Sequence, residues 1–375
     1  MTILHVIPAL NPAQGGLLST LAGLCLAWHK AGGRCEVAAL ESSGRAAVLE
    51  HAKVKLFAPG RPRRLAASPA MKAWLARNAP RFDAIFAQGL WLSPTRYAFN
   101  AAQSARRPFF LLPAGMLDPD ALAHHRFRKA LRWWLGEGGM VRRANILFST
   151  EEDRDRAMNH LGLEPGRCHI LPNPVQDVWF DMAPPAPAPM PRVACLNRLH
   201  PRKGVLELVQ ALSLLHGRGV AVHATVAGPE EDRAYVARCR EAGAALERAG
   251  RLCWAGLLDG AGARALVAAS DIVVHPAVGF ENFGMVIAEA LAAGRVVVAS
   301  RRALVTPQLE RAGLVEAVEP QPASLAAGLS RLLERRARWP ELAARARTYA
   351  REHFGADAVG RRLMALLQGS ITTCV

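Results

Sequence analysis

Residues 272–300 read IVVHPAVGFENFGMVIAEALAAGRVVVAS, and this stretch decides the fold. A short apolar run is followed by a glycine-containing loop, a helical pattern over 285–293 and a second apolar run over 296–299. Two short apolar runs separated by a helix predict a βαβ unit of a parallel sheet. In open α/β sheets ligands bind beyond the carboxyl ends of the strands, so the loop after the first run is a predicted binding site.

Two carboxylates, Glu281 and Glu289, stand eight positions apart around the start of this helix. On one continuous helix that spacing would leave the side chains about 80° apart rather than on one face. We therefore place Glu281 in the loop and Glu289 in the helix, where a carboxylate can accept hydrogen bonds from vicinal ribose hydroxyls. The backbone N–H groups at the helix start can receive phosphate or sugar oxygens. The pair alone also fits an acid favoured by the helix dipole and a surface glutamate.

A second segment, residues 193–204, reads VACLNRLHPRKG and is followed by a helical pattern over 205–215. Arg198 and Lys203 place two cations after an apolar run, an arrangement suited to a diphosphate. Alone, such a pair is more typical of a solvated loop. It gains weight because the two-glutamate unit follows about 80 residues later.

Together these segments resemble the GT-B glycosyltransferases of group 1, the retaining family 4, whose signature is two glutamates separated by seven residues. Arg295 stands where the family often has proline. The resemblance implies an α/β protein with two Rossmann-like, doubly wound parallel-sheet domains facing across a cleft. It also implies a nucleotide-sugar-dependent hexosyltransferase that uses a UDP-, GDP- or ADP-sugar and needs no cofactor or metal.

The resemblance also assigns roles to single residues. It implies catalytic roles for Glu281, Arg198 and Lys203, with the two cations gripping the departing diphosphate. It implies donor-binding roles for Glu289, Asn282, Phe283, Gly284 and Met285, and for Gly15 and Gly16 in a loop after an apolar run at 3–8. The implied reaction retains the anomeric configuration, because the acceptor hydroxyl attacks the face from which the diphosphate leaves.

Two further segments are similar to those of enzymes in bacterial surface-polysaccharide or lipopolysaccharide assembly. AQGLW (87–91) resembles a His-Gly-Leu-Trp segment, and LPAGMLDP (112–119) resembles one containing Pro-His-Gly-Met-Leu-Asp-Pro. They imply an acceptor side formed by Gln88, Trp91 and Met116, facing a glycan or lipid-linked acceptor. The family histidines are replaced by Gln88, which can still hydrogen-bond, and by Ala114, which cannot. The missing histidines keep open the alternative of a non-catalytic partner or glycan-binding protein of the same fold. A phosphorylase or synthase with a soluble acceptor is a further alternative.

The domain organisation follows from a proline-rich segment, residues 183–191, which reads APPAPAPMP and predicts a stiff, extended linker. We expect an amino-terminal acceptor-side domain over 1–182 and a donor domain over 192–345. The resemblance implies that a helix over 346–375 crosses back to the first domain. Apolar runs that predict parallel strands lie at 35–40, 84–87, 109–112, 146–149, 169–171, 222–227, 252–254 and 314–318.

The composition limits the possible partners. The formal net charge is +16, but only 6 of the 47 basic residues are lysines, and the arginines are spread along the whole chain without a nucleic-acid-binding motif. We therefore expect no nucleic-acid partner. The seven cysteines form no Cys-x-x-Cys pair and are expected to be reduced. No apolar run of transmembrane length and no signal-peptide pattern occurs, which favours a cytoplasmic protein.

Segment 126–135, RFRKALRWWL, predicts an amphipathic basic helix from Arg126 to Leu135. Its apolar side chains fall on one face and its four cations on the other, as in helices that lie on an anionic membrane. An ordinary domain helix packing that face inward is equally compatible with the pattern. The first interpretation predicts peripheral contact with the inner face of the cytoplasmic membrane.

Metal binding was considered because the other main glycosyltransferase fold holds a divalent ion with an Asp-x-Asp pair. Asp118 with Asp120, and Asp153 with Asp155, have that spacing. The first pair lies in the acceptor-type loop, and the second lies at a helix start, where acids favour the dipole. We therefore expect no metal site and assign charge neutralisation to Arg198 and Lys203.

Overall fold

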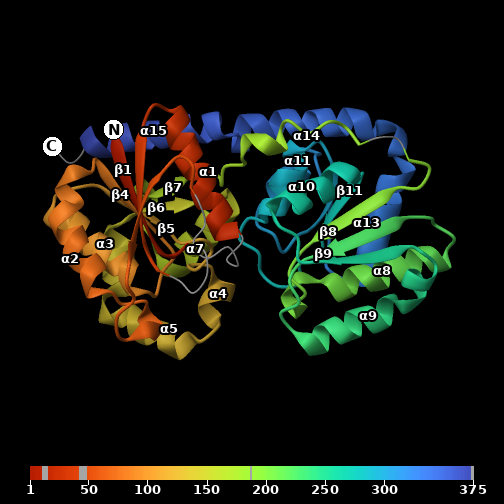
Figure 1. Cartoon of the computed structure of the whole chain (residues 1–375), viewed down its shortest axis with the longest axis horizontal. Helices are drawn as coiled ribbons and strands as arrows, with labels where there is room; N and C mark the ends of the chain where they lie inside the picture. Colours follow the sequence, from red (N-terminus) through yellow and green to blue (C-terminus); the bar gives the residue numbers. More distant parts are fainter. Residues whose placement is uncertain (11–15, 42–48, 186–187, 373–375) are drawn as a thin grey trace. The chain divides into compact units, whose positions relative to one another are not determined.

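A computed structural model describes residues 1–10, 16–41, 49–185 and 188–372. The chain divides into unit 1, Met1–Gln176 with His353–Val375, and unit 2, Asp177–Glu352. Each unit contains one parallel sheet flanked by helices (Figure 1). The predicted α/β class with two Rossmann-like parallel-sheet domains is confirmed.

Over the described residues, the sheet of unit 1 has seven parallel strands. They are β1 Thr2–Ala9, β2 Arg34–Leu40, β3 Lys53–Phe57, β4 Ala84–Gln88, β5 Phe109–Leu112, β6 Asn145–Phe148 and β7 Cys168–Ile170. Their order is β3-β2-β1-β4-β5-β6-β7, so the winding reverses between β1 and β4. Strand β3 was not predicted, because this edge strand is mostly exposed and carries lysines instead of an apolar run.

Helices cover both faces of this sheet. The described helices of unit 1 are α1 Gly16–Lys30, α2 Pro69–Asn78, α3 Ser93–Ser104, α4 Pro119–Ala123, α5 Arg126–Arg132, α6 Gly138–Arg143, α7 Glu151–Leu161 and α15 Ala356–Thr372. On β1, Leu4 and Val6 pack with residues of α2 and α3, whereas Ile3 and Ile7 pack with residues of α1 and α15. Burial on both faces explains why the central strands read as continuous apolar runs.

The stretch expected as one helix over 346–375 contains parts of two helices. α14 (Trp339–Phe354) ends just before Gly355, and α15 begins at Ala356. α15 then packs on α1 within unit 1, where a Cβ at Gly360 would lie only 2.3 Å from the Ala27 carbonyl oxygen. The small residue therefore permits a close helix–helix approach.

The sheet of unit 2 has six parallel strands among the described residues, in the order β10-β9-β8-β11-β12-β13. They are β8 Arg192–Leu196, β9 His223–Ala227, β10 Leu252–Gly256, β11 Ile272–His275, β12 Val296–Ser300 and β13 Glu316–Val318. The helices are α8 Val205–Gly217, α9 Arg233–Arg248, α10 Gly260–Ala269, α11 Met285–Ala292, α12 Thr306–Arg311 and α13 Pro322–Glu334, with α14 at the end of the unit. The winding reverses between β8 and β11, so the loops after these strands are neighbours at the switch point.

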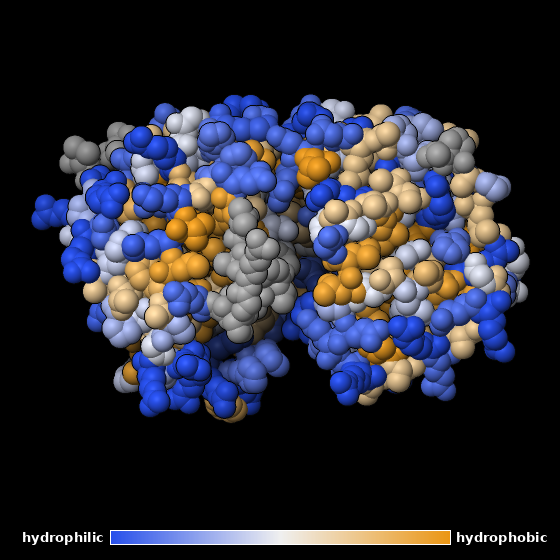
Figure 2. Space-filling model, in the orientation of Figure 1, coloured by the Kyte–Doolittle hydropathy of each residue, from blue (hydrophilic) through white to orange (hydrophobic). Residues whose placement is uncertain are grey.

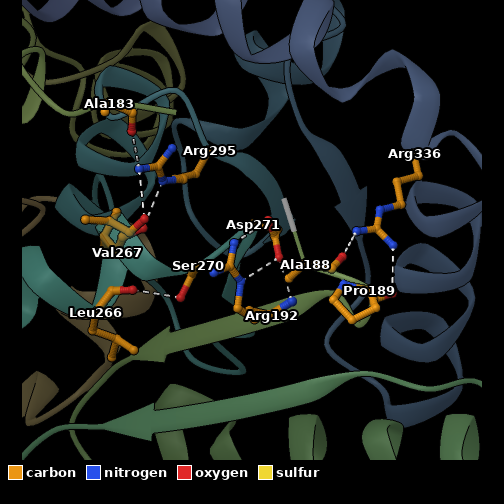
Figure 3. Close-up of polar contacts among 11 residues, drawn as sticks. Ala183, Ala188, Pro189, Arg192, Leu266, Val267, Ser270, Asp271, Arg295 and Arg336 are labelled. Atoms are coloured by element: carbon orange, nitrogen blue, oxygen red, sulfur yellow. Dashed lines mark hydrogen bonds and ion pairs between the residues drawn. The ribbon is translucent and has the colours of Figure 1, made fainter. Parts of the chain in front are cut away.

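Arg295 has a structural role that the sequence did not indicate. Its side chain is fully buried and donates to the carbonyl oxygens of Val267 (2.8 Å) and Ala268 (3.2 Å) at the end of α10, and to that of Ala183 (2.8 Å) (Figure 3). A cation is favourable at a helix carboxyl terminus. Burial lowers the pKa of Arg295 to about 10, so the guanidinium stays charged at neutral pH.

Two more arginines bind backbone carbonyl oxygens within the proline-rich segment and directly before it. Arg347 donates to the carbonyl oxygen of Met182 at 2.6 Å. Arg336 donates to the carbonyl oxygens of Ala188 and Pro189, the second at 3.1 Å (Figure 3). The described part of this segment is therefore fixed to unit 2 by side chains that are distant in the sequence.

Figure 2 shows hydrophilic residues spread over the visible face of each unit, with smaller apolar areas between them. Within the described ranges, none of the helices has the length and apolar character needed to span a bilayer.

Candidate functional site

The candidate donor site of unit 2 lies where β8 and β11 end. A basic loop follows β8 and closes with a 3-10 turn, Pro201–Lys203, before α8. Gly204 joins this turn to α8 with φ +70°, and a Cβ there would lie 2.1 Å from the Pro276 carbonyl oxygen. Only glycine permits both that backbone conformation and so close an approach of the two loops.

Backbone hydrogen bonds fix the two loops to each other. The amides of Val278 and Gly279 donate to the Arg202 carbonyl oxygen at 3.1 and 2.9 Å. The Arg202 guanidinium also lies 3.4 Å from the Phe280 carbonyl oxygen. The acidic loop therefore has a defined position over the basic loop.

Glu281 is the centre of this arrangement. Its amide donates to the Arg302 carbonyl oxygen and its carbonyl oxygen accepts from the Leu304 amide, both at 3.0 Å. Its carboxylate forms an ion pair with Lys203, and His275 Nε2 lies 3.9 Å from the same carboxylate oxygen. The structure thus brings together two of the three predicted catalytic residues, which are 78 positions apart.

The charge states of this cluster follow from burial and pairing. Burial raises the pKa of Glu281, but Lys203, His275 and Arg198 lower it more, so the pKa lies below its ordinary value. Burial lowers the pKa of His275 to about 4, so its imidazole is neutral at pH 7. The cluster is therefore an ionised Glu281–Lys203 pair beside a neutral histidine, which sequence reasoning had not included in the site.

Glu289 lies in the second turn of α11, as predicted, and Glu281 lies in the loop. The helix begins at Met285 after Gly284, whose φ is +75°, and Phe283 is buried beside it. The partly buried Glu289 carboxylate forms no hydrogen bond or ion pair with any described residue. Burial raises its pKa to about 7. A desolvated carboxylate without a partner is available to accept from ligand hydroxyls.

Arg198, the third predicted catalytic residue, is engaged elsewhere. Its half-exposed guanidinium makes two contacts to Glu231, at 3.0 and 2.9 Å. Exposed ion pairs contribute little to stability. A diphosphate with two charged oxygens can therefore compete for this guanidinium at small cost.

The three predicted acceptor-side residues of unit 1 lie at or after the carboxyl ends of the neighbouring strands β4 and β5. Gln88 is the last residue of β4, and both polar atoms of its buried amide are without a hydrogen-bond partner. Trp91 has φ +70°, and its buried indole N–H is likewise unpartnered. Met116 follows β5, and its sulfur lies 3.2 Å from the Leu90 amide. The structure therefore has buried polar groups without a hydrogen-bond partner at the end of β4 and just after it.

His5 is a buried polar residue that sequence reasoning passed over. It lies on β1 beside Phe86 of β4, with 5.0 Å between ring centroids, and neither ring nitrogen has a partner. Burial lowers its pKa to about 3, so it is neutral. Alternation along β4 places Gln88 on the same sheet face as Phe86. The sequence does show this residue as a histidine inside the otherwise apolar run at 3–8.

The other positions singled out in the sequence are Gly15, Gly16 and the aspartates of the Asp-x-Asp pairs. Gly16 is the first residue of α1, and Gly15 lies outside the described residues. Asp118 caps α4 and accepts from Arg156 at 2.7 Å, so this aspartate supports the acceptor loop. Asp153 is buried in the first turn of α7. Within the described ranges, no group of three or more His, Cys, Asp or Glu side chains is arranged to hold a metal ion.

Family models match both halves of the chain. Residues 15–174 match the model described as "Glycosyl transferase 4-like domain", and residues 190–335 match "Glycosyl transferases group 1". The chain belongs to the group 1 GT-B glycosyltransferases. It is accordingly a nucleotide-sugar glycosyltransferase.

Solved structures share the GT-B fold of this glycosyltransferase over nearly its full length. Anabaena Alr3699/HepE in complex with UDP and glucose has a TM-score of 0.75 at 21% identity, covering 98% of this chain and 100% of its own. Sucrose-phosphate synthase from Thermosynechococcus elongatus has a TM-score of 0.79 at 18% identity, with full coverage of both chains. A glycosyltransferase from Rickettsia africae has a TM-score of 0.76 at 16% identity, covering 99% and 98%. None of the curated proteins compared with the chain matches it.

Proposed function

We propose that this glycosyltransferase moves a hexosyl group, with retention of configuration, from a nucleotide-diphosphate sugar to a hydroxyl of a glycan or lipid-linked acceptor. The observation that carries the proposal is the Lys203–Glu281 ion pair at the switch point of unit 2, with an unpartnered Glu289 on the following helix. Its setting would be the cytoplasmic assembly of a surface polysaccharide, lipopolysaccharide or glycolipid.

In the proposed donor complex, Glu289 accepts from the ribose hydroxyls, and Arg198 and Lys203 face the diphosphate. Glu281 and the Phe283–Gly284 backbone hold the sugar hydroxyls, with Asn282 and Met285 beside them. The bond between the anomeric carbon and the phosphate oxygen breaks while the acceptor oxygen bonds to the same face. The acceptor proton passes to an oxygen of the leaving phosphate. The two cations stabilise the charge that develops there, so no metal is required in this proposal.

Among UDP, GDP and ADP, we propose UDP as the nucleotide of the donor. The support is that HepE, a protein of the same fold, was crystallised with UDP, with UDP-glucose, and with UDP and glucose. At 20–21% identity this likeness indicates the fold, so the base is a proposal for this chain and is tested against GDP and ADP.

For the acceptor, Gln88 is proposed to take the place of the family histidine. Its buried amide has both a donor and an acceptor free, as recognition of a sugar hydroxyl requires. Trp91 supplies an aromatic side chain and Met116 closes the neighbouring loop. Gln88→Leu should raise KM for the acceptor more than KM for the donor, and equal effects would argue against this assignment.

The deciding experiment is thermal unfolding with UDP, GDP, ADP and their sugars. A ligand at about 100 times its dissociation constant should stabilise the protein by about 2.7 kcal/mol. Glu289→Ala should abolish that stabilisation, whereas Glu247→Ala, an exposed glutamate on α9, should leave it intact. Stabilisation by none of these nucleotides would favour a non-catalytic partner, and transfer to small soluble sugars alone would favour a synthase.

A further inference from the structure

Four large apolar side chains are exposed together on one side of unit 1. Phe127 and Leu131 of α5 are 77% and 57% exposed, and Trp134 and Leu135 of the next turn are 81% and 57% exposed. The predicted helix over 126–135 is α5 followed by a π-helical turn, Trp133–Glu137. The interpretation that this face packs inward is therefore wrong for these four residues.

These side chains are separate from the core of the unit. The neighbouring Trp133 packs against the hydrophobic core, and Met140 of α6 is part of it, but none of the four exposed residues belongs to that cluster. Eleven large apolar residues are exposed along the described part of the chain, and four of them lie within nine positions here. A concentration of this kind marks an interaction surface rather than scattered exposure.

The charged side chains of the segment that carries this apolar face are all positive. Residues 124–135 contain four cations and no acid, and Arg126 and Arg128 are exposed. The Arg126 guanidinium lies 4.8 Å from the centre of the Phe127 ring. Aromatic side chains beside arginines favour a partner that is apolar inside and anionic at its surface, which is the structure of an anionic lipid bilayer.

Buried ion pairs hold this face in position. Glu137, which ends the π-helical turn, is buried between Arg96 of α3 at 3.2 Å and Arg132 of α5 at 3.7 Å. Arg96 also donates to the Leu135 carbonyl oxygen at 3.2 Å. The exposed face is therefore preorganised by the domain and requires no folding on binding.

The same element contacts the acceptor-side loop. The Lys129 ammonium lies 5.9 Å from the centre of the Trp91 ring and donates to the Ala121 carbonyl oxygen. A surface that binds through α5 would therefore lie next to the loop that carries Trp91 and follows Gln88. A lipid-linked acceptor would be presented at that position, which is the one consequence that rests on the proposed function.

We propose that Phe127, Leu131, Trp134 and Leu135, together with Arg126 and Arg128, form a docking surface for an anionic lipid bilayer. We call this surface the α5 face. The apolar side chains insert at the level of the headgroups and acyl boundary, and the arginines pair with lipid phosphates.

The test is binding of the full chain to phosphatidylcholine vesicles with and without 30 mol% (about one lipid in three) phosphatidylglycerol, measured by co-sedimentation. We expect binding to the anionic vesicles and at least about tenfold weaker affinity after Phe127→Ser with Trp134→Ser. Arg126→Gln with Arg128→Gln should weaken it about 25-fold, because each cation near an anionic surface contributes roughly fivefold. Brominated lipids should quench wild-type tryptophan fluorescence, and Trp134→Phe should remove most of that quenching.

Matched controls lie on unit 2. Leu214→Ser on α8 removes another exposed leucine, and Arg218→Gln with Arg248→Gln removes two other exposed arginines. These changes should leave vesicle binding unchanged. Absence of binding to anionic vesicles, or equal binding by the Phe127→Ser, Trp134→Ser variant, would overturn the proposal. So would light scattering in which the wild type dimerises through this face and the doubly substituted variant does not.

Nucleotide binding separates this proposal from the proposed function. A chain that binds UDP but no vesicles refutes the docking surface alone. A chain that binds vesicles but no nucleotide refutes the proposed function alone.

Discussion

Glu289→Gln gives the sharpest test of the candidate donor site, because its effects on stability and on ligand binding have opposite signs. Burial raises the pKa of Glu289 from 4.5 to about 7 in the folded chain. Between these values the folded state binds more protons than the unfolded state, so this group's contribution to stability falls as pH rises from about 4.5 to about 7. Above pH 7 the folded protein carries the full cost of a desolvated carboxylate, which the neutral glutamine removes.

The magnitude follows from the shift. About 2.5 pH units at 1.36 kcal/mol each would give roughly 3 kcal/mol, which we reduce to about 2 kcal/mol because Glu289 is only partly buried. Glu289→Gln should therefore stabilise the ligand-free protein by about 2 kcal/mol at pH 8 and by almost nothing at pH 4.5. For a unit of this size the melting temperature at pH 8 should rise by about 4–8 °C.

Nucleotide affinity should change in the opposite direction to stability. Ribose hydroxyls donate to the ionised carboxylate, so wild-type affinity for UDP should fall about tenfold between pH 8 and pH 6 as Glu289 takes up a proton. Glu289→Gln should bind weakly at both pH values. The assays are thermal unfolding over pH 4.5–8 and titration calorimetry with UDP, with Glu247→Gln as the control. Equal stability changes at pH 4.5 and pH 8, or a wild-type affinity independent of pH, would refute the reasoning.

Three further substitutions test the contacts around this site. Lys203→Ala leaves the largely buried Glu281 carboxylate without its cation and should lower the free energy of unfolding by about 3 kcal/mol, measured by urea denaturation. Adding Glu281→Gln should recover much of this loss. Strictly additive effects of the two substitutions would contradict the ion pair. Arg295→Ala removes a buried cation from three carbonyl oxygens and should destabilise unit 2 by about 3 kcal/mol, and an unchanged melting temperature would contradict that structural role. Gly204→Ala should abolish nucleotide binding and lower the free energy of unfolding by at least about 2 kcal/mol. Gly219 also has a positive φ but has open space around it, so Gly219→Ala should lower the free energy of unfolding by only about 1 kcal/mol. Equal losses would show that backbone strain alone sets the cost.

Much of the donor site could be predicted from local sequence because its parts are set by local rules. The run of apolar residues before His275 and the glycine at position 284 fix where the strand ends and where α11 begins. Those boundaries place Glu281 in the loop and Glu289 in the helix without reference to the rest of the chain. The positions of Arg198 and Lys203 after β8 follow in the same way.

The contacts between these segments could not be predicted from local sequence. The pairing of Lys203 with Glu281 depends on β8 and β11 becoming neighbours in the sheet, although 78 positions separate the two side chains. The low pKa of His275 and the high pKa of Glu289 depend on how completely the surrounding chain excludes water. Arg295 looked like a departure from a family pattern, and only the fold shows the carbonyl oxygens that it binds.

The amphipathic pattern around α5 shows most clearly what the sequence alone could not predict. Its sequence separates apolar from basic side chains, but a helix that packs on a core and a helix that faces outward have the same periodicity. The exposure of Phe127 and Trp134, and the packing of the partly buried Trp133 against the core, were decided by the tertiary structure. By itself, the sequence determined the family, the strands of the sheet centres and the candidate donor residues, because these depend on patterns a few residues long. The tertiary structure decided which of these groups meet, which lose water and which face outward, because those properties depend on packing between residues far apart in the chain.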